Sequence, residues 1–149
     1  MNLVDELSQF KTIFIDTAPI IYYIEAHSQF GPLVKNVIDL FRSGRLIAFS
    51  SVITLTEVLP KPVEAGNEVL VKKFLEFFKH GKNLNLLEIT TGIAEKAGRL
   101  RGKYPGLKTI DAIQLSGAIE IGANVFLTND KKLGQVKEIK VFILKDFTE

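Results

Sequence analysis

Short apolar runs that alternate with segments of helical periodicity are the feature that most constrains the fold of this chain. The runs are rich in Ile, Val, Leu and Phe, a composition typical of buried strands. They are predicted as strands at residues 12–15, 46–49, 84–89, 125–128 and 139–144. Parallel strands need crossover connections, which the helical segments supply. The pattern therefore predicts an α/β fold, a three-layer α/β/α sandwich around a mainly parallel sheet of about five strands.

The segments between the strands carry helix start and stop signals. The predicted helices span residues 20–25, 32–43, 68–80 and 108–121, with two more running from Ser50 or Ser51 through Glu57 and from Thr90 or Thr91 to Pro105-Gly106. Residues 130–136 are expected to form a short turn or helix. Pro60 and Pro62 are expected to stop the helix that carries Glu57, because proline lacks the backbone N–H that continues a helix.

Length and composition fit one globular domain. The chain has 149 residues, of which 46% are apolar and 24% charged, and domains most often contain roughly 100–150 residues. We therefore expect residues 1–149 to form a single domain with one active site. No apolar run reaches the roughly 18 residues of a membrane span, and the N-terminus carries acids where a signal peptide would carry cations. A cytoplasmic location is the resulting expectation.

The content of cysteine, histidine and charge excludes several kinds of site. Without cysteine the chain has no disulfide, thiolate nucleophile or Cys-ligated zinc. His27 and His80 lie far apart with no acid or nucleophile patterned around them, which argues against a histidine triad or a zinc site. The net charge of +2 is too small to indicate a nucleic-acid binder by itself.

Two aspartates lie just beyond predicted strands. Asp16 directly follows residues 12–15, and Asp130 comes two residues after the strand 125–128. In open α/β sheets, ligands bind beyond the carboxyl ends of the strands, so both side chains are placed to meet a ligand. Each could instead serve only as the N-cap of the helix that follows, because aspartate is common at that position.

Two further acids lie in predicted helices. Asp111 interrupts a strongly apolar helix and shares a face with Leu115 and Ala118, which is a core-facing position. Glu57 is bracketed by apolar residues and is expected to face the interior more than a solvent-facing acid would. The alternatives are that the helix dipole stabilises Asp111 in the first turn, by about 0.3–1 kcal/mol, and that Glu57 is a partly exposed residue of a short helix.

Convergence of Asp16, Glu57, Asp111 and Asp130 would require bound cations or protons. Each pair of carboxylates repels by about 4 kcal/mol at roughly 4 Å and an effective dielectric of about 20. Four groups make six pairs, whose sum rivals a whole folding free energy of about 5–15 kcal/mol. Partial protonation or bound cations must offset this repulsion. Oxygen-only ligation favours Mg²⁺ or Mn²⁺ over zinc.

The segments around these acids resemble the PIN domain family, and most closely the single-domain VapC-type toxins of toxin–antitoxin systems. The matching segments are Ile13-Phe14-Ile15-Asp16-Thr17, Ser51-Val52-Ile53-Thr54-Leu55-Thr56-Glu57-Val58-Leu59, Thr109-Ile110-Asp111-Ala112 and Phe126-Leu127-Thr128-Asn129-Asp130. All four occur in the family order and together span nearly the whole chain. One departure is the leader of residues 1–10, whose Val4, Leu7 and Phe10 could pack as an extra helix.

The resemblance implies an endoribonuclease that hydrolyses RNA with a cation-activated water and leaves a 3′-hydroxyl and a 5′-phosphate. It implies that the four acids hold one or two Mg²⁺ or Mn²⁺ ions, with Thr17, Thr128 and Asn129 as candidates for the surrounding hydrogen-bond shell. It also implies a homodimer and an antitoxin protein that occludes the acidic groove. The alternatives within the family are an RNA-processing or decay nuclease and a non-catalytic PIN-like scaffold.

Basic residues near the acids in sequence are candidates for RNA contacts. They are Arg99, Arg101, Lys103 and Lys108, which precede Asp111, and Lys131 and Lys132, which follow Asp130. Binding the substrate's phosphates at the acidic pocket requires positively charged side chains close to it. The alternative for the first three is that they only complement the C-terminus of their helix.

An aspartyl-phosphate enzyme is a rival reading of an acid at the end of a strand. Phosphatases with an aspartyl nucleophile would be expected to carry a second acid two residues after Asp16, where this chain has Ala18. A phosphorylated receiver-like pocket would need paired acids early in the fold, and these are also missing. The four-acid pattern therefore favours the nuclease.

Overall fold

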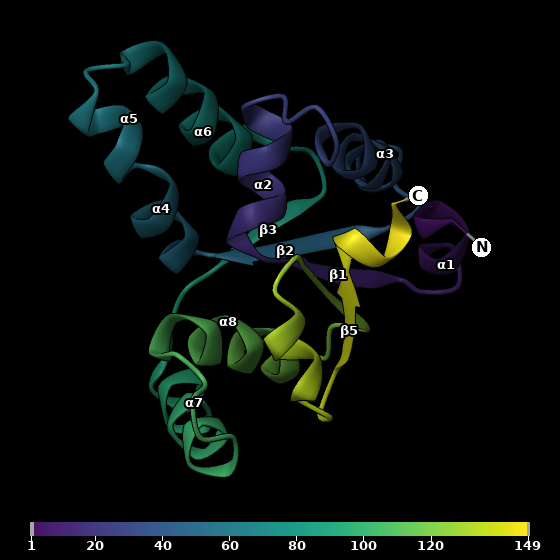
Figure 1. Cartoon of the computed structure of the whole chain (residues 1–149), viewed down its shortest axis with the longest axis vertical. Coiled ribbons are helices and arrows are strands. Elements are labelled where there is room, and N and C mark those ends of the chain that lie inside the picture. The colour runs from purple at the N-terminus through teal and green to yellow at the C-terminus, as the bar shows by residue number, and fades with distance from the viewer. Residues whose placement is uncertain (1, 149) are drawn as a thin grey trace.

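A computed structural model describes residues 2–148, and its centre is a parallel sheet of five strands (Figure 1). The strands are β1 (Thr12–Ile15), β2 (Ile47–Ser51), β3 (Leu84–Leu87), β4 (Val125–Thr128) and β5 (Lys140–Ile143), in the spatial order β3-β2-β1-β4-β5. Every neighbouring pair is parallel. The predicted strands and the predicted sandwich are therefore confirmed.

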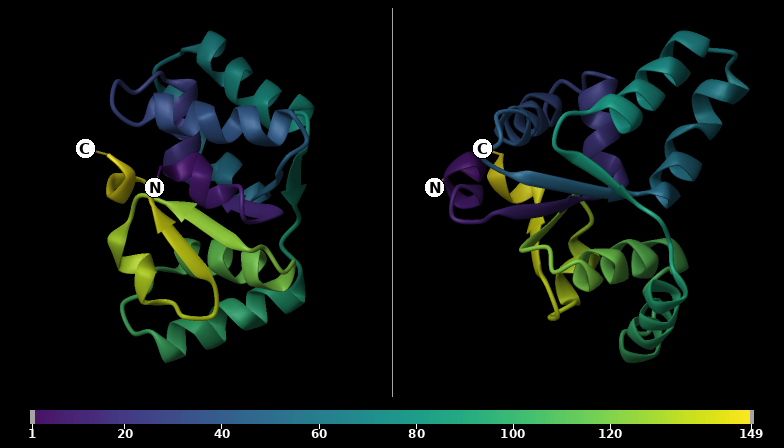
Figure 2. Two further views of the ribbon diagram at one scale, coloured as in Figure 1. Left: turned by 90° about the vertical axis from the view of Figure 1, so that its right-hand side faces the viewer. Right: turned by 180° about the vertical axis from the view of Figure 1, so that it is seen from behind.

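Helices cover both faces of the sheet. They are α1 (Leu3–Leu7), α2 (Thr17–Ile24), α3 (Gly31–Arg42), α4 (Val52–Val58), α5 (Pro60–Glu64), α6 (Glu68–His80), α7 (Thr91–Lys103) and α8 (Thr109–Glu120), with 3₁₀ turns η1 (Lys131–Gln135) and η2 (Leu144–Phe147). Figures 1 and 2 show α2, α3 and α6 on one face and α7 with α8 on the other. None of the helices in residues 2–148 combines the length and apolar character needed to cross a bilayer.

The helix that carries Glu57 ends before Pro60 and Pro62, as expected, and Pro60 also begins a second helix that was not predicted. Helix α4 ends at Val58, and the short helix α5 begins at Pro60. Proline is well tolerated in a first turn, because the N–H that it lacks would have no partner there. The segment after Glu57 is therefore helical rather than a loop.

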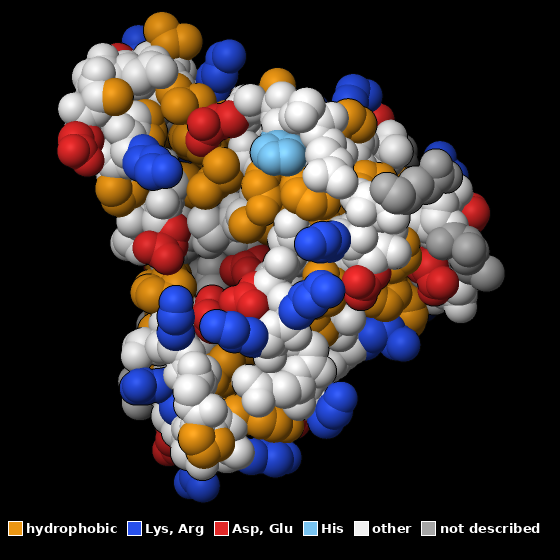
Figure 3. Space-filling model, viewed as in Figure 1, with side chains coloured by type: hydrophobic (Ala, Val, Ile, Leu, Met, Phe, Trp, Pro, Cys, Tyr) orange, Lys and Arg blue, Asp and Glu red, His pale blue; other side chains and the backbone are white. Residues whose placement is uncertain are grey.

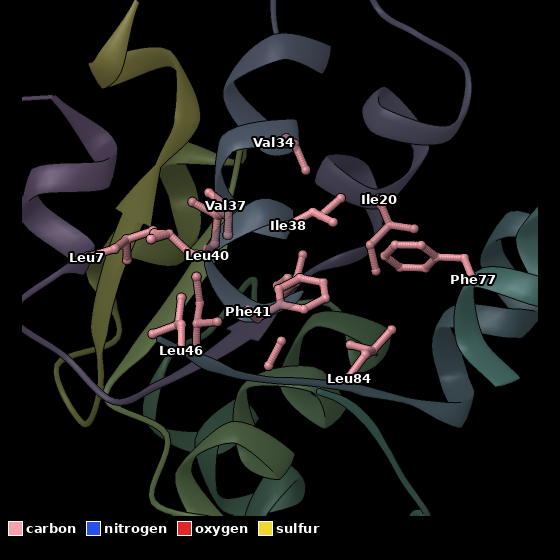
Figure 4. Packing of buried hydrophobic residues seen from close by; sticks show 14 of the residues in the cluster. Leu7, Ile20, Val34, Val37, Ile38, Leu40, Phe41, Leu46, Phe77 and Leu84 are labelled. Atoms are coloured by element: carbon pink, nitrogen blue, oxygen red, sulfur yellow. The ribbon is translucent and has the colours of Figure 1, made fainter. Parts of the chain in front are cut away.

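Apolar side chains pack on both faces of the central strand. Ile13, Phe14 and Ile15 of β1 are all fully buried, as expected for a strand with neighbours on both sides and helices above and below. Phe14 stacks on Phe126 of β4 at 5.4 Å between ring centroids, on the side of α7 and α8. Ile13 and Ile15 belong to the other cluster, part of which Figure 4 shows.

The leader adds a helix, as expected from its apolar residues. Leu3 and Leu7 of α1 are buried in the cluster that α2, α3 and α6 cover. Phe10 meets Phe142 of β5 in an edge-to-face contact, with 6.1 Å between ring centroids. Helix α1 therefore packs in this cluster, and Phe10 contacts β5.

The order of the strands creates a crevice between β1 and β4. From β1 the chain passes through α2 and α3 to β2, and it returns from β3 through α7 and α8 to β4, which lies on the other side of β1. The connections of β1 and β4 therefore diverge to opposite faces of the sheet. In open α/β sheets this switch point, at the carboxyl ends of the strands, is where ligands bind.

Candidate active site

All four predicted acids line one open pocket at the switch point. The pocket has a volume of about 420 Å³, and its walls include Asp16, Glu57, Asp111 and Asp130. These residues come from the end of β1, from α4, from the first turn of α8 and from the loop after β4. Figure 3 shows acidic side chains gathered in the hollow between the upper and lower parts of the molecule, with basic side chains along its lower rim.

Asp16 is the most buried of these acids. It occupies the N-cap position of α2, but its side chain makes no capping hydrogen bond there. Instead Asp16 Oδ2 accepts a hydrogen bond of 2.8 Å from Thr128 Oγ1, across the β1–β4 crevice. Burial raises the pKa of Asp16 from its ordinary 3.8 to about 6, with Asp111 and Asp130 adding to the rise and Thr128 and the Thr17 amide opposing it. The reading of Asp16 as a simple cap is therefore wrong.

Asp111 lies half-buried on the pocket wall, in the first turn of α8. Burial raises the pKa of its carboxyl, and the charge of Asp130 adds to this effect. Lys108 lowers the pKa of Asp111, whereas Glu57 raises it. The charges of two acids and one cation therefore act on the carboxyl of Asp111.

Glu57 does not face the interior, contrary to the expectation. Its residue is exposed, although it lines the same pocket as the other acids. Thr54 and Val58 are the buried residues of α4, and they turn the helix so that Glu57 projects at the rim. The alternative of an exposed glutamate on a short helix is therefore correct for burial, while its side chain still borders the site.

Asp130 serves as a helix cap and also lines the pocket. Its Oδ1 accepts a hydrogen bond of 3.0 Å from the backbone N–H of Lys132, at the start of η1. The backbone N–H of Asp130 donates to Thr128 Oγ1 at 3.2 Å. The hydroxyl of Thr128 thus joins Asp16 to the backbone of Asp130, and one side chain positions two acids.

The other two candidates for the hydrogen-bond shell differ in their bonding. Thr17 Oγ1 is buried and has no hydrogen-bond partner among residues 2–148. Asn129 has a partner at each end of its amide, since its Nδ2 donates to Tyr22 Oη at 3.3 Å and its Oδ1 accepts from the N–H of Lys145 at 3.0 Å. The hydroxyl of Thr17 is therefore free to bond a ligand in the pocket, whereas the Asn129 amide ties the loop after β4 to Tyr22 and Lys145.

The donor set of the pocket fits a hard divalent cation. Across residues 2–148, no group of three or more acids or histidines lies close enough together to hold a metal ion by direct ligation alone. Mg²⁺ does not need such a cage, because it is usually held by one or two carboxylates and keeps several water ligands. The carboxylates in the pocket wall and the unpaired hydroxyl of Thr17 suit a hydrated ion of this kind.

Three of the six basic candidates lie beside the acids. Lys131 lines the acidic pocket itself. Lys108 and Lys132 line an adjoining pocket of about 290 Å³, whose walls also include Asp111 and Asp130. The two pockets therefore meet at these aspartates, and lysines flank the acids on the side of the second pocket.

The other three basic candidates have partners elsewhere. Arg99 pairs with Glu95 at 3.6 Å on the exposed surface of α7. Arg101 Nε donates to the carbonyl of Leu107 at 3.3 Å, and Lys103 pairs with Glu138 at 3.1 Å. Neither pocket that contains the acids is lined by Arg99, Arg101 or Lys103.

A buried polar cluster behind the pocket was missed by the sequence analysis. Gln114 of α8 is fully buried and contacts the side chains of Ser51 and Thr54 at the start of α4, which are also buried. The signal was present, because Gln114 interrupts the same apolar helix that made Asp111 conspicuous. A buried amide needs hydrogen-bond partners, and none could be identified from its neighbours in sequence.

The sequence matches the PIN domain family over residues 13–139. No functionally curated protein has significant sequence similarity to the chain.

Several solved structures are similar in fold, among them the following three. VapBC2 from Rickettsia felis, bound to a DNA fragment from the promoter, has a TM-score of 0.73 at 18% identity, covering 89% of this chain and 98% of the other. A toxin–antitoxin complex from Klebsiella pneumoniae has a TM-score of 0.65 at 21% identity, covering 89% and 97%. VapC20 from Mycobacterium tuberculosis, a sarcin-ricin loop cleaving toxin, has a TM-score of 0.66 at 16% identity, covering 86% and 98%. With the family match across most of its length, the chain belongs to the PIN domain family.

Proposed function

We propose that this chain is a metal-dependent endoribonuclease that hydrolyses phosphodiester bonds of RNA at the acidic pocket. The observation that carries the proposal is the convergence of Asp16, Glu57, Asp111 and Asp130, from four separate segments, on the β1–β4 switch point. RNA is favoured as the substrate because the structurally similar VapC20 is a sarcin-ricin loop cleaving toxin. The alternative substrate class, DNA, can be tested in the same assay.

Asp16 and Asp111 are the proposed holders of the principal Mg²⁺ or Mn²⁺ ion, because both line the pocket and burial raises the pKa of each, a cost of ionisation that a bound cation would offset. Glu57 and Asp130 complete the shell or hold a second ion. When bound, such an ion lowers the pKa of a water molecule and offsets charge at the phosphorus. Thr128 keeps the Asp16 carboxylate in place through its hydrogen bond.

Lys108, Lys131 and Lys132 are the proposed contacts to the substrate's phosphates. Each lines a pocket that also contains Asp111 and Asp130, so each lies beside the proposed point of cleavage. Lysine binds phosphate as a point charge without requiring a fixed geometry. The hydroxyl of Thr17 is free to donate to a water or a phosphate oxygen in the pocket.

The central test is incubation of structured and unstructured RNA with the purified full chain and Mg²⁺ or Mn²⁺, beside a chelator control and a DNA substrate of the same sequence. We expect cleavage of RNA that requires the cation. Folded protein that binds Mn²⁺ but cuts no RNA would contradict the nuclease and favour a scaffold. Cleavage of DNA alone would contradict the substrate class.

Charge reversal of Lys132 is expected to weaken RNA binding about fivefold while leaving cation binding unchanged. The loss of one phosphate contact should also reduce the slope of log affinity against log salt by roughly 0.7–0.9. Fluorescence anisotropy of labelled RNA with a cleavage-inactive protein, in a salt series, measures both quantities.

The matched control is Lys11→Glu. Lys11 is exposed and directly precedes β1, so it lies at the amino edge of the sheet, whereas Asp16 follows the same strand at the carboxyl edge. An equal loss of affinity in both variants would show that only overall charge matters, and would contradict a specific contact at Lys132.

We further propose that the chain is the toxin of a toxin–antitoxin pair, a homodimer that acts on cytoplasmic RNA. The support is the similarity of its fold to VapBC2 and to the toxin–antitoxin complex from Klebsiella pneumoniae. A partly exposed apolar strip formed by Leu55, Leu59 and Val63 lies along α4 and α5, next to Glu57 in sequence, where a protein partner could cover the pocket. Co-expression with the product of the adjacent gene should abolish RNA cleavage, and unchanged cleavage would contradict this partner.

A further inference from the structure

Four buried side chains form a hydrogen-bonded cluster between β2, α4 and α8. Ser51 Oγ donates to Gln114 Oε1, and Gln114 Nε2 donates to Thr54 Oγ1 at 2.8 Å. The hydroxyls of Thr54 and Ser50 are hydrogen-bonded at 3.0 Å. All four residues have an exposed fraction of 0%. Both ends of the Gln114 amide are thus paired with the first turn of α4 and its cap.

The cluster lies directly behind two acids of the pocket. Thr54 comes three residues before Glu57 on α4, and Gln114 comes three residues after Asp111 on α8. Residues three apart on a helix lie on the same side, one turn from each other. The bond between Gln114 and Thr54 therefore links the turn next to Glu57 with the turn next to Asp111.

We propose that Gln114, with Ser51 and Thr54, is a positioning device that fixes the separation of Glu57 and Asp111 for a divalent cation. This inference rests on the cation site of the proposed function. It assigns no contact with the substrate to Gln114. Its role is to hold two helices, each of which carries one acid.

The position of Glu57 depends on how its helix is held. Its side chain is exposed, so packing does not fix it. Helix α4 has only seven residues, too few to be stable without tertiary contacts. Glu57 and Asp111 line the same pocket and carry like charges, so they also repel each other. The direct bonds from Gln114 to Ser51 and Thr54 oppose the separation of the two helices.

The test is a calorimetric titration of the full chain with Mn²⁺, comparing wild type with Gln114→Met. Methionine has nearly the length of glutamine and fills the space without forming hydrogen bonds. We expect the Mn²⁺ dissociation constant to rise at least about tenfold, the size typical for residues that orient metal ligands. The Mn²⁺ concentration for half-maximal RNA cleavage should rise in parallel, with the rate at saturating Mn²⁺ largely kept.

Ser116→Ala is the matched control for loss of a buried hydrogen bond. Ser116 is also fully buried in α8, but its Oγ donates to the carbonyl of Ile93 at 2.6 Å, toward α7 rather than α4. This variant should lower the melting temperature and leave Mn²⁺ affinity unchanged. Thr54→Val should weaken Mn²⁺ binding as Gln114→Met does, whereas Thr54→Ser, which keeps the hydroxyl, should restore it. If Gln114→Met does not fold, the comparison of Thr54→Val with Thr54→Ser tests the inference by itself.

Three outcomes separate this inference from the proposed function. If Gln114→Met and Thr54→Val bind Mn²⁺ as tightly as wild type, the cluster is only structural and the inference is overturned. Wild-type protein that binds Mn²⁺ but does not cleave RNA would contradict the proposed nuclease and leave the inference standing. Wild-type protein that binds no Mn²⁺ would overturn both.

Discussion

Replacing Asp111 with Asn is expected to lower cation-dependent RNA cleavage by at least about a hundredfold. Asparagine keeps the shape of the side chain but loses the negative charge that would hold the ion at the wall of α8. A bound cation contributes several kcal/mol to stabilising the transition state of phosphoryl transfer, and about 1.4 kcal/mol corresponds to a factor of ten in rate. Single-turnover cleavage of labelled RNA across a Mn²⁺ series measures the loss.

The control for this substitution is Asp39→Asn. Asp39 is an exposed acid of α3 whose partner is Lys35, at 3.0 Å in an i,i+4 ion pair. This variant should cleave RNA like wild type. Full cation-dependent cleavage by Asp111→Asn would show that this carboxylate does not hold the ion, and the assignment of Asp111 would have to be abandoned.

The sheet and the position of the site at its carboxyl edge could be predicted because they depend on local sequence patterns. The strand β1 ends at Ile15 and Asp16 follows it, so alternation of strands and helices is enough to place this acid at the edge where ligands bind. The same holds for Asp130 after β4. Neither step requires knowledge of which strands are neighbours.

The orientation of side chains on short helices could not be predicted in the same way. Glu57 has apolar neighbours in sequence on both sides, yet it is exposed because Thr54 and Val58 supply the buried face of α4. The burial of Thr54 depends on Gln114, which is 60 residues away. Orientation on a helix of seven residues is thus set by a long-range contact rather than by its own periodicity.

The contacts of the basic surface residues could not be predicted from the local sequence either. Lys108 and Arg101 both lie close to Asp111 in sequence, but only Lys108 lines a pocket with it. Arg101 instead bonds the backbone of the loop after α7, through Leu107. Long cationic side chains have several partners within reach, and their choice depends on the path of the loop, which Pro105-Gly106 does not specify.

Asp16→Asn is expected to make the metal-free protein more stable at neutral pH, by about 3 kcal/mol at most. Burial raises the pKa of Asp16 from 3.8 to about 6, and each pKa unit corresponds to about 1.4 kcal/mol. The folded protein therefore binds the proton of Asp16 more tightly than the unfolded chain does. This contribution to stability is complete below the unfolded pKa of 3.8 and is lost as the pH rises through about 6.

The free energy of unfolding in urea is measured for wild type and Asp16→Asn in EDTA, at pH values from 4 to 7.5. Titrations common to both proteins cancel when the two free energies are subtracted, so the difference isolates the contribution of Asp16. We expect the difference to be small near pH 4 and to grow in favour of the variant until about pH 7. Asparagine can still accept the hydrogen bond from Thr128, whose donation to Asp16 is 2.8 Å long. Saturating Mg²⁺ should stabilise wild type and not the variant, since the ion replaces the proton as the partner of the Asp16 carboxylate. A difference that does not change with pH would show that Asp16 is ionised in the folded protein without cost, and an acid of that kind would need no cation to offset its burial.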